Sequence, residues 1–133
     1  MPSRAFFSVL SADLPRSKSW YTSLFGYEVE FDSDWFVHLR DPVNPALELG
    51  IIAIDHEIVA DSMRATPVGG TMTLVVDDVD AVHALARDRG IEIIEAPRDL
   101  FFGQRRLLIA DPDGQVIDVS SECPPDPDWL ATL

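Results

Sequence analysis

Two carboxylates, Glu48 and Asp118, are the side chains whose types and placement best suit acid–base chemistry. Glu48 follows the turn Asp41-Pro42, and Asp118 follows the turn Asp111-Pro112. The two turns are 70 residues apart, and so are the two carboxylates. If the two carboxylates were buried together, repulsion between like charges would raise the pKa of one and leave an acid beside a base. The plainer interpretation is that each is solvated or bonded to an arginine.

Other reactive side chains give weaker patterns. His38 lies in an expected strand, where a lone histidine is usually solvated or hydrogen-bonded; with Glu48 and Asp118 it would form a three-ligand metal set, which we treat as the alternative. No nucleophile-elbow motif surrounds any serine. Cys123 is the single cysteine, so it forms neither an intramolecular disulfide nor a cysteine-rich zinc site. We therefore expect no covalent catalysis.

The elements that must position these residues occur twice. Asp13 follows an apolar run and opens a helical stretch that ends at Gly26, and Asp78 and Gly90 repeat that arrangement. Aspartate caps the free N–H groups at a helix start, and glycine tolerates the left-handed conformation at a helix end. The patterns predict helices near 15–25 and 79–89, and strands near 5–12, 27–31, 35–40, 46–53, 71–77, 91–95, 104–110 and 115–120.

The repeat divides the chain into two modules of one α+β domain that spans residues 1–133. Module one covers about 5–53, module two covers about 71–121, residues 54–70 form a linker, and 122–133 form a proline-rich tail. In each module a strand and a helix precede three further strands, so the expected architecture is two βαβββ units in tandem.

Charge excludes several classes of partner. The 133 residues include 23 Asp and Glu against 10 Lys and Arg, which gives a net charge of −13 at pH 7. Nucleic acids and anionic membrane surfaces both require basic side chains, so neither is an expected partner. No apolar run approaches the ~18 residues of a membrane span, and we expect a cytoplasmic protein.

The motifs at both ends of the repeat resemble the vicinal oxygen chelate superfamily, which includes glyoxalase I, bleomycin resistance proteins and extradiol dioxygenases. The first helix of that superfamily is similar to Asp13-Leu14-Pro15-Arg16-Ser17 with Trp20-Tyr21 and Phe25-Gly26, and its last hairpin is similar to 111–118. The resemblance implies two modules whose mixed sheets curl around a shared cleft, commonly completed as a homodimer.

Carried over residue by residue, the family's metal-ligand positions are Phe6, Glu48, Thr71 and Asp118. A phenyl ring cannot ligate a metal, and a threonine hydroxyl is a weak neutral ligand. Open catalytic metal sites generally need about three protein ligands. We therefore expect no metal and no cofactor, with a metal-dependent lyase or dioxygenase as the alternative function.

The aromatic residues near predicted turns and the cleft positions form the candidate binding site. Large rings beside turns supply stacking surfaces for flat or cationic ligands. This combination resembles the bleomycin-resistance branch, which implies a non-catalytic, homodimeric protein that sequesters a flat or cationic small molecule such as an antibiotic. A third alternative is an interaction module whose rings serve assembly only. The expected ligand-binding residues are Phe6, Trp35, Phe36, Glu48, Thr71, Phe101, Phe102 and Asp118.

Overall fold

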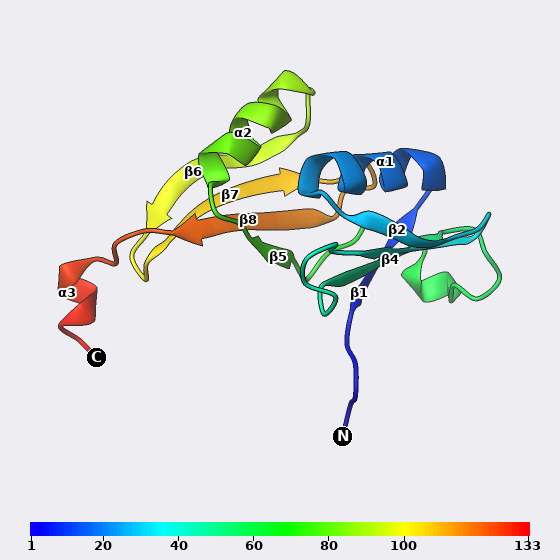
Figure 1. The fold of residues 1–133 in the computed structure, drawn as a ribbon, viewed down its shortest axis with the longest axis horizontal. Helices are drawn as coiled ribbons and strands as arrows, with labels where there is room; N and C mark the ends of the chain where they lie inside the picture. Colours follow the sequence, from blue (N-terminus) through cyan, green and yellow to red (C-terminus); the bar gives the residue numbers. More distant parts are fainter. The chain divides into compact units, whose positions relative to one another are not determined.

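The computed structural model describes all 133 residues and divides into two compact units. Unit one comprises residues 1–67 with 112–114, and unit two comprises residues 68–111 with 115–133. Each unit holds one open four-stranded mixed sheet and one long helix (Figure 1). The predicted α+β architecture of two similar modules in tandem is confirmed.

Unit one contains a sheet with the strand order β1-β4-β3-β2, in which β1 runs parallel to β4 and the other neighbours are antiparallel. A single 3₁₀ turn, η1, follows the sheet. The elements are β1 (Phe7–Ser11), α1 (Leu14–Phe25), β2 (Glu28–Asp32), β3 (Phe36–Arg40), β4 (Glu48–Ala53) and η1 (Asp61–Met63).

The helix α1 begins and ends as its sequence predicts. The Asp13 carboxylate accepts a hydrogen bond from the Arg16 backbone N–H at 3.1 Å, and Gly26 ends the helix in the left-handed conformation at φ 75°. The helix α1 lies along one side of the sheet (Figure 1), where one of its faces is buried and it contacts β3 and β4. The fully or nearly fully buried strand residues on that side are Val9, Val37, Leu39, Leu49 and Ile51.

Unit one also includes a short segment from the second half of the chain, residues 112–114. Asp113, within residues 112–114, accepts a hydrogen bond from the Ala12 backbone N–H at 2.9 Å and another from the Ser17 hydroxyl at 3.2 Å. The buried Ser17 hydroxyl lies 2.6 Å from that of Ser11. The start of α1 is thus held by a residue that lies far away in the sequence.

Unit two repeats the arrangement with the strand order β5-β8-β7-β6, where β5 is parallel to β8. The helix α2 is capped by Asp78, which accepts from the backbone N–H groups of Asp80 and Ala81, and Gly90 follows it at φ 64°. The elements are β5 (Met72–Val75), α2 (Val79–Asp88), β6 (Ile93–Leu100), β7 (Gln104–Ala110), β8 (Val116–Glu122) and α3 (Pro127–Leu130).

Two elements of unit two differ from the prediction. The strand β6 continues to Leu100, beyond the expected end near 95, through two register irregularities on either side of Glu95. Pro97 fits because β6 is the edge strand of its sheet, where one side of the backbone needs no partner. The tail forms one short helix, α3, which Asp126 caps and Pro127 begins.

None of the helices combines the length and the apolar composition that a membrane-spanning helix requires.

Candidate functional site

The strand register of unit one determines which side chains share a face. His38 pairs with Gly50, and Arg40 pairs with Glu48, across the antiparallel β3 and β4. Directly paired residues point to the same side of a sheet, and successive residues alternate. Val37, Leu39 and Leu49 are buried on the side that faces α1. His38, Gly50, Arg40 and Glu48 therefore lie on the opposite side of the sheet. We call this side, with Phe6, Phe36, His38, Arg40, Glu48 and Gly50, the distal face of unit one.

Glu48 is the most heavily bonded side chain of the distal face, and its side chain is only 5% exposed. Arg4 donates to both carboxylate oxygens, from Nε to Oε2 at 2.7 Å and from Nη2 to Oε1. Arg40 Nη2 donates to Oε1 at 3.1 Å. His38 Nε2 lies 2.8 Å from Oε1 and donates its proton, because an ionised carboxylate can only accept.

These contacts fix the charge state of Glu48. The hydrogen bond from Arg4 is the largest cause that lowers the pKa of this carboxyl from 4.5 to about 2, against the opposing effect of burial, and His38 and Arg40 lower it further. Glu48 is therefore ionised at neutral pH, with three donors on Oε1 and one on Oε2. Of the two interpretations of Glu48, the arginine-bonded carboxylate is the one found, and the acid–base role does not fit.

Aromatic rings surround Gly50 on the same face. The Phe36 and His38 rings are nearly parallel, with 13° between planes and 6.4 Å between centroids, and Phe6 lies 5.9 Å from His38. A Cβ at position 50 would lie 3.1 Å from the Phe36 ring, 3.3 Å from the Phe6 ring and 2.5 Å from Ser8 Oγ. The absence of a side chain at Gly50 thus leaves room for the rings to approach the sheet.

The aromatic surface extends along β2 and β3. Phe31 lies 6.3 Å from Phe36, and Trp35 lies 5.4 Å from the same ring. Trp35 also stacks on His56, with 4.7 Å between centroids and 23° between planes. Phe31 is exposed and Phe6 is 43% exposed, so stacking area remains open in this unit.

The Arg4 guanidinium joins the charged and aromatic parts of the distal face. Its central carbon lies 4.8 Å from the centroid of the Phe6 ring, within the range of a cation–π contact. The guanidinium therefore contacts both Phe6 and Glu48. Sequence reasoning did not single out Arg4 or Arg40; the alternation Phe36, His38, Arg40 places Arg40 on one side with the two rings, but only the cross-strand register brings Glu48 to it.

The predicted polar residues of unit two bond within their own sheet. Asp118 accepts a hydrogen bond from the Ser120 hydroxyl at 2.6 Å, and it pairs with Thr73 and Leu108 in the register. The Thr71 hydroxyl donates to the backbone carbonyl of Val116 at 3.0 Å. Both predicted residues thus have partners inside unit two.

Phe101 and Phe102 lie in the turn between β6 and β7 and form a cluster with the tail. Their rings meet edge to face at 5.2 Å, and Trp129 of α3 meets Phe101 edge to face at 5.6 Å. The Asp126 backbone N–H donates to the Phe101 carbonyl at 2.8 Å and holds the tail against this turn. Among the predicted binding residues, unit one therefore brings together Phe6, Trp35, Phe36 and Glu48, and unit two holds Thr71, Phe101, Phe102 and Asp118.

The residues present do not fit the metal that the family resemblance implies. No group of three or more His, Cys, Asp or Glu side chains is arranged to hold a metal ion. Phe6 has no ligand atom, and the oxygens of Glu48 accept from Arg4, Arg40 and His38. A cation at Glu48 would have to displace a guanidinium that is already there.

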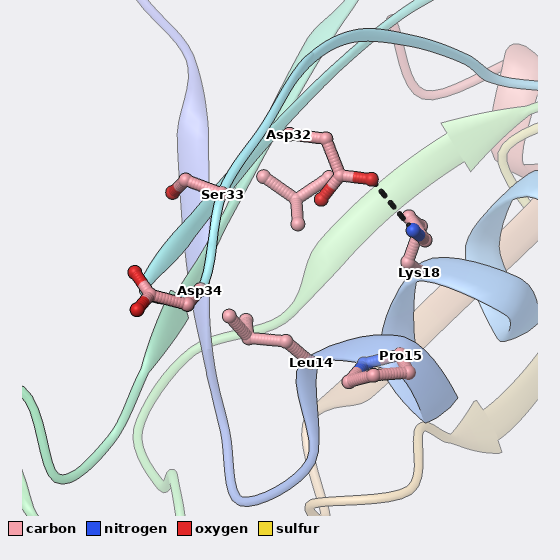
Figure 2. Close-up of a pocket in the computed structure, with 7 residues that line it drawn as sticks. Leu14, Pro15, Lys18, Asp32, Ser33 and Asp34 are labelled. Atoms are coloured by element: carbon pink, nitrogen blue, oxygen red, sulfur yellow. Dashed lines mark hydrogen bonds and ion pairs between the residues drawn. The ribbon is translucent and has the colours of Figure 1, made fainter.

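Unit one has a separate hollow of about 240 Å³ between the start of α1 and the β2–β3 turn. Figure 2 shows Lys18 and Asp32 facing each other across it, joined by an ion pair of 2.7 Å. Val37, one of its lining residues, points toward α1, so the hollow lies on the opposite side of the sheet from the distal face. The full lining is Leu14, Pro15, Lys18, Asp32, Ser33, Asp34 and Val37.

Comparison with known proteins identifies the family. A model of the Glyoxalase/Bleomycin resistance protein/Dioxygenase superfamily matches residues 5–119. The chain belongs to this superfamily. The match spans both modules and the linker between them, in agreement with the resemblance seen in the helix and hairpin motifs. No curated protein matches the sequence.

Several solved structures share the fold of this chain at low sequence identity. A superfamily member from Sphaerobacter thermophilus DSM 20745 is 21% identical with a TM-score of 0.73, covering 92% of this chain and 98% of its own. TnmS3, an antibiotic binding protein from Streptomyces sp. CB03234, is 23% identical with a TM-score of 0.74, covering 92% and 97%. ATC0852 from Agrobacterium tumefaciens is 23% identical with a TM-score of 0.76, covering 93% and 100%.

Proposed function

We propose that this protein binds a flat aromatic small molecule on the distal face of unit one and releases it unchanged. The observation that carries the proposal is the bonding of Glu48. Its carboxylate accepts hydrogen bonds from two arginines and a histidine, so it is neither a free base nor a free metal ligand. What the face still offers to a ligand is aromatic surface.

The rings suit stacking because several of them remain accessible. Phe6 and Phe31 are exposed, and Phe36 lies between Phe31 and His38. An offset or edge-to-face aromatic contact contributes about 0.5–1.5 kcal/mol beyond the burial of its area. Two or three such contacts account for micromolar affinity only when apolar burial is added, which favours a ligand of several fused rings over a single ring.

The comparisons support binding as the class of function. TnmS3, whose fold this chain shares, is an antibiotic binding protein. The superfamily also contains dioxygenases and glyoxalases, so membership alone does not choose between binding and catalysis. The bonding of Glu48 favours binding.

Tryptophan fluorescence tests the proposal directly. The chain has three tryptophans, and the double variant Trp20→Phe, Trp129→Phe leaves Trp35, beside Phe36, as the only reporter. We expect saturable quenching by a flat polycyclic ligand at tens of micromolar or below. A panel of polycyclic compounds, with a bleomycin-type glycopeptide among them, that gives no saturable quenching in this range would contradict the proposal.

Phe6 and Phe7 provide a matched pair of variants for that titration. Both side chains are 43% exposed, but they are adjacent in the chain and point to opposite sides of the sheet. We expect Phe6→Ala to weaken binding about fivefold, as the loss of one ring contact of about 1 kcal/mol implies. Phe7→Ala should leave the dissociation constant within about twofold of the original. Equal losses in the two variants would place the ligand elsewhere.

Elemental analysis separates the proposal from the enzymatic alternative. We expect protein purified without chelators to contain no stoichiometric Zn, Fe, Mn or Ni, because Arg4 and Arg40 occupy the Glu48 oxygens. One equivalent of any of these metals, lost on Glu48→Gln and retained on Glu57→Gln, would favour a metal-dependent lyase or dioxygenase. Glu57 is a suitable control because it is exposed.

A further inference from the structure

We infer that the ligand of the distal face is a planar aromatic acid, whose carboxylate or phenolate oxygen is held by Arg4 and Arg40. The inference rests on the proposed function and adds the chemical class of the ligand. The ligand it names is an anion. Composition alone would favour a cation, since a protein with a net charge of −13 would be expected to attract cations.

The first argument for an anionic ligand is the number of guanidinium and carboxylate groups around Glu48. Two guanidinium groups, Arg4 and Arg40, share the single buried carboxylate of Glu48. Two exposed glutamates also lie near Arg40: Glu28, which pairs with it across β2 and β3, and Glu30, whose carboxylate lies 3.9 Å from Arg40 Nε, at the outer limit of an ion pair. Water and salt screen such an exposed contact strongly. Among the directly bonded groups of the distal face, two guanidinium groups therefore share one buried carboxylate.

Unused hydrogen-bond donors carry the second step. A guanidinium has five N–H groups. Arg40 donates to Glu48 through Nη2, while its Nε is buried and makes no hydrogen bond. Buried donors are almost always satisfied in folded proteins, so this N–H has a place for an acceptor, which a water or a ligand oxygen can fill. An anionic oxygen is the acceptor that guanidinium groups bind best.

The positions of rings and charges carry the third step. Arg4 lies over the Phe6 ring, and Arg40 follows His38 and Phe36 at alternate positions of the same strand. A planar molecule that stacks on the rings thus has the two guanidinium groups at its edge. A cationic ligand would find no free carboxylate there, because Glu48 is already bonded.

Three probes with the same ring system test the inference: 2-naphthoate, 2-naphthalenemethanol and 2-naphthylmethylammonium. Amide chemical-shift titrations of the ¹⁵N-labelled protein at pH 7 measure weak binding and its place, with Gly50 and His38 as reporters of the distal face. We expect naphthoate to bind at least about fivefold more tightly than the alcohol, since a charge-assisted hydrogen bond is roughly twice as strong as a neutral one. The ammonium probe should bind most weakly.

Two arginines of similar exposure serve as test and control. The Arg4 side chain is 52% exposed and that of Arg16, in α1, is 47% exposed. We expect Arg4→Met to reduce the naphthoate affinity to that of the alcohol while the alcohol affinity stays within about twofold, and Arg16→Met to change neither. Arg40→Gln is the second test variant, and its spectrum reports whether the fold is kept.

The outcomes separate this inference from the proposed function. If naphthoate and the alcohol bind equally, or the ammonium probe binds most tightly, the ligand class is wrong while aromatic binding stands. If naphthoate keeps its advantage in both Arg4→Met and Arg40→Gln, the assignment to these arginines is overturned. If no probe shifts the Gly50 and His38 amides at millimolar concentration, the proposed function fails together with the inference.

Discussion

Glu48 shows how neighbours decide the role of a single carboxylate. Its position in the repeat is the one at which the family resemblance implies a metal ligand, yet the structure gives its oxygens to Arg4, Arg40 and His38. A buried carboxylate without such partners would be costly to ionise. The arginines therefore supply the positive charge that stabilises the ionised form of Glu48.

The bonding of Glu48 makes the unfolding free energy depend on pH. The folded-state pKa of Glu48 is about 2, below its ordinary value of 4.5, so its stabilising contribution is complete above pH 4.5 and is lost as the pH falls toward 2. We expect urea denaturation to show a larger loss of unfolding free energy for Glu48→Gln at pH 7 than at pH 2.5. The exposed Glu57→Gln should show no such difference. A loss for Glu48→Gln that is equal at both pH values would contradict the assignment.

At the scale of elements, the starts of α1 and α2 are each specified by one local residue, the aspartate that caps the helix. The Asp13 carboxylate accepts from the Arg16 backbone N–H, and we expect Asp13→Ala to lower the unfolding free energy by about 1 kcal/mol. Asp13→Asn should restore most of that loss, because asparagine caps a helix nearly as well as aspartate. Urea unfolding at neutral pH measures both variants. A loss as large in Asp13→Asn as in Asp13→Ala would mean that charge, rather than capping, is what matters.

The caps also explain which parts of the fold could be predicted. Asp13, Gly26, Asp78 and Gly90 act on residues within one or two turns, so the sequence predicts the helices within a few residues. The strand β6 can extend past Pro97 because it is an edge strand. No local sequence pattern predicts that position in the sheet. Element types were therefore predictable, and edges and register were not.

The residues of the candidate site differ in the same way in how far the sequence predicts them. Residue type, the repeat and the family resemblance are enough to propose Phe6, Phe36 and Glu48 as site residues. They do not predict the partners of Glu48, because Arg4 precedes β1 and Arg40 meets Glu48 only through the register of β3 with β4. The sequence offers His38 as an alternative metal ligand, and in the structure its Nε2 lies 2.8 Å from Glu48 Oε1.

At the scale of the whole molecule, we propose a homodimer that assembles against its own charge. Each chain carries a net charge of −13, so association must overcome repulsion that salt screens. We expect light scattering to give about twice 14.8 kDa, and the dimer fraction to rise as NaCl increases from about 10 mM to about 150 mM, where the Debye length falls from about 30 Å to about 8 Å. A mass near 14.8 kDa at every salt concentration would contradict a dimer.

The contribution of residues 112–114 to unit one has a consequence for the order of synthesis. The ribosome completes residues 1–67 well before it reaches Asp113, whose carboxylate accepts from the Ala12 backbone N–H and the Ser17 hydroxyl. Until residue 113 has been made, the Ala12 backbone N–H and the Ser17 hydroxyl therefore lack this acceptor. A fragment cut at residue 67 lacks that residue, and a chimera that exchanges first modules between relatives must carry residues 112–114 as well.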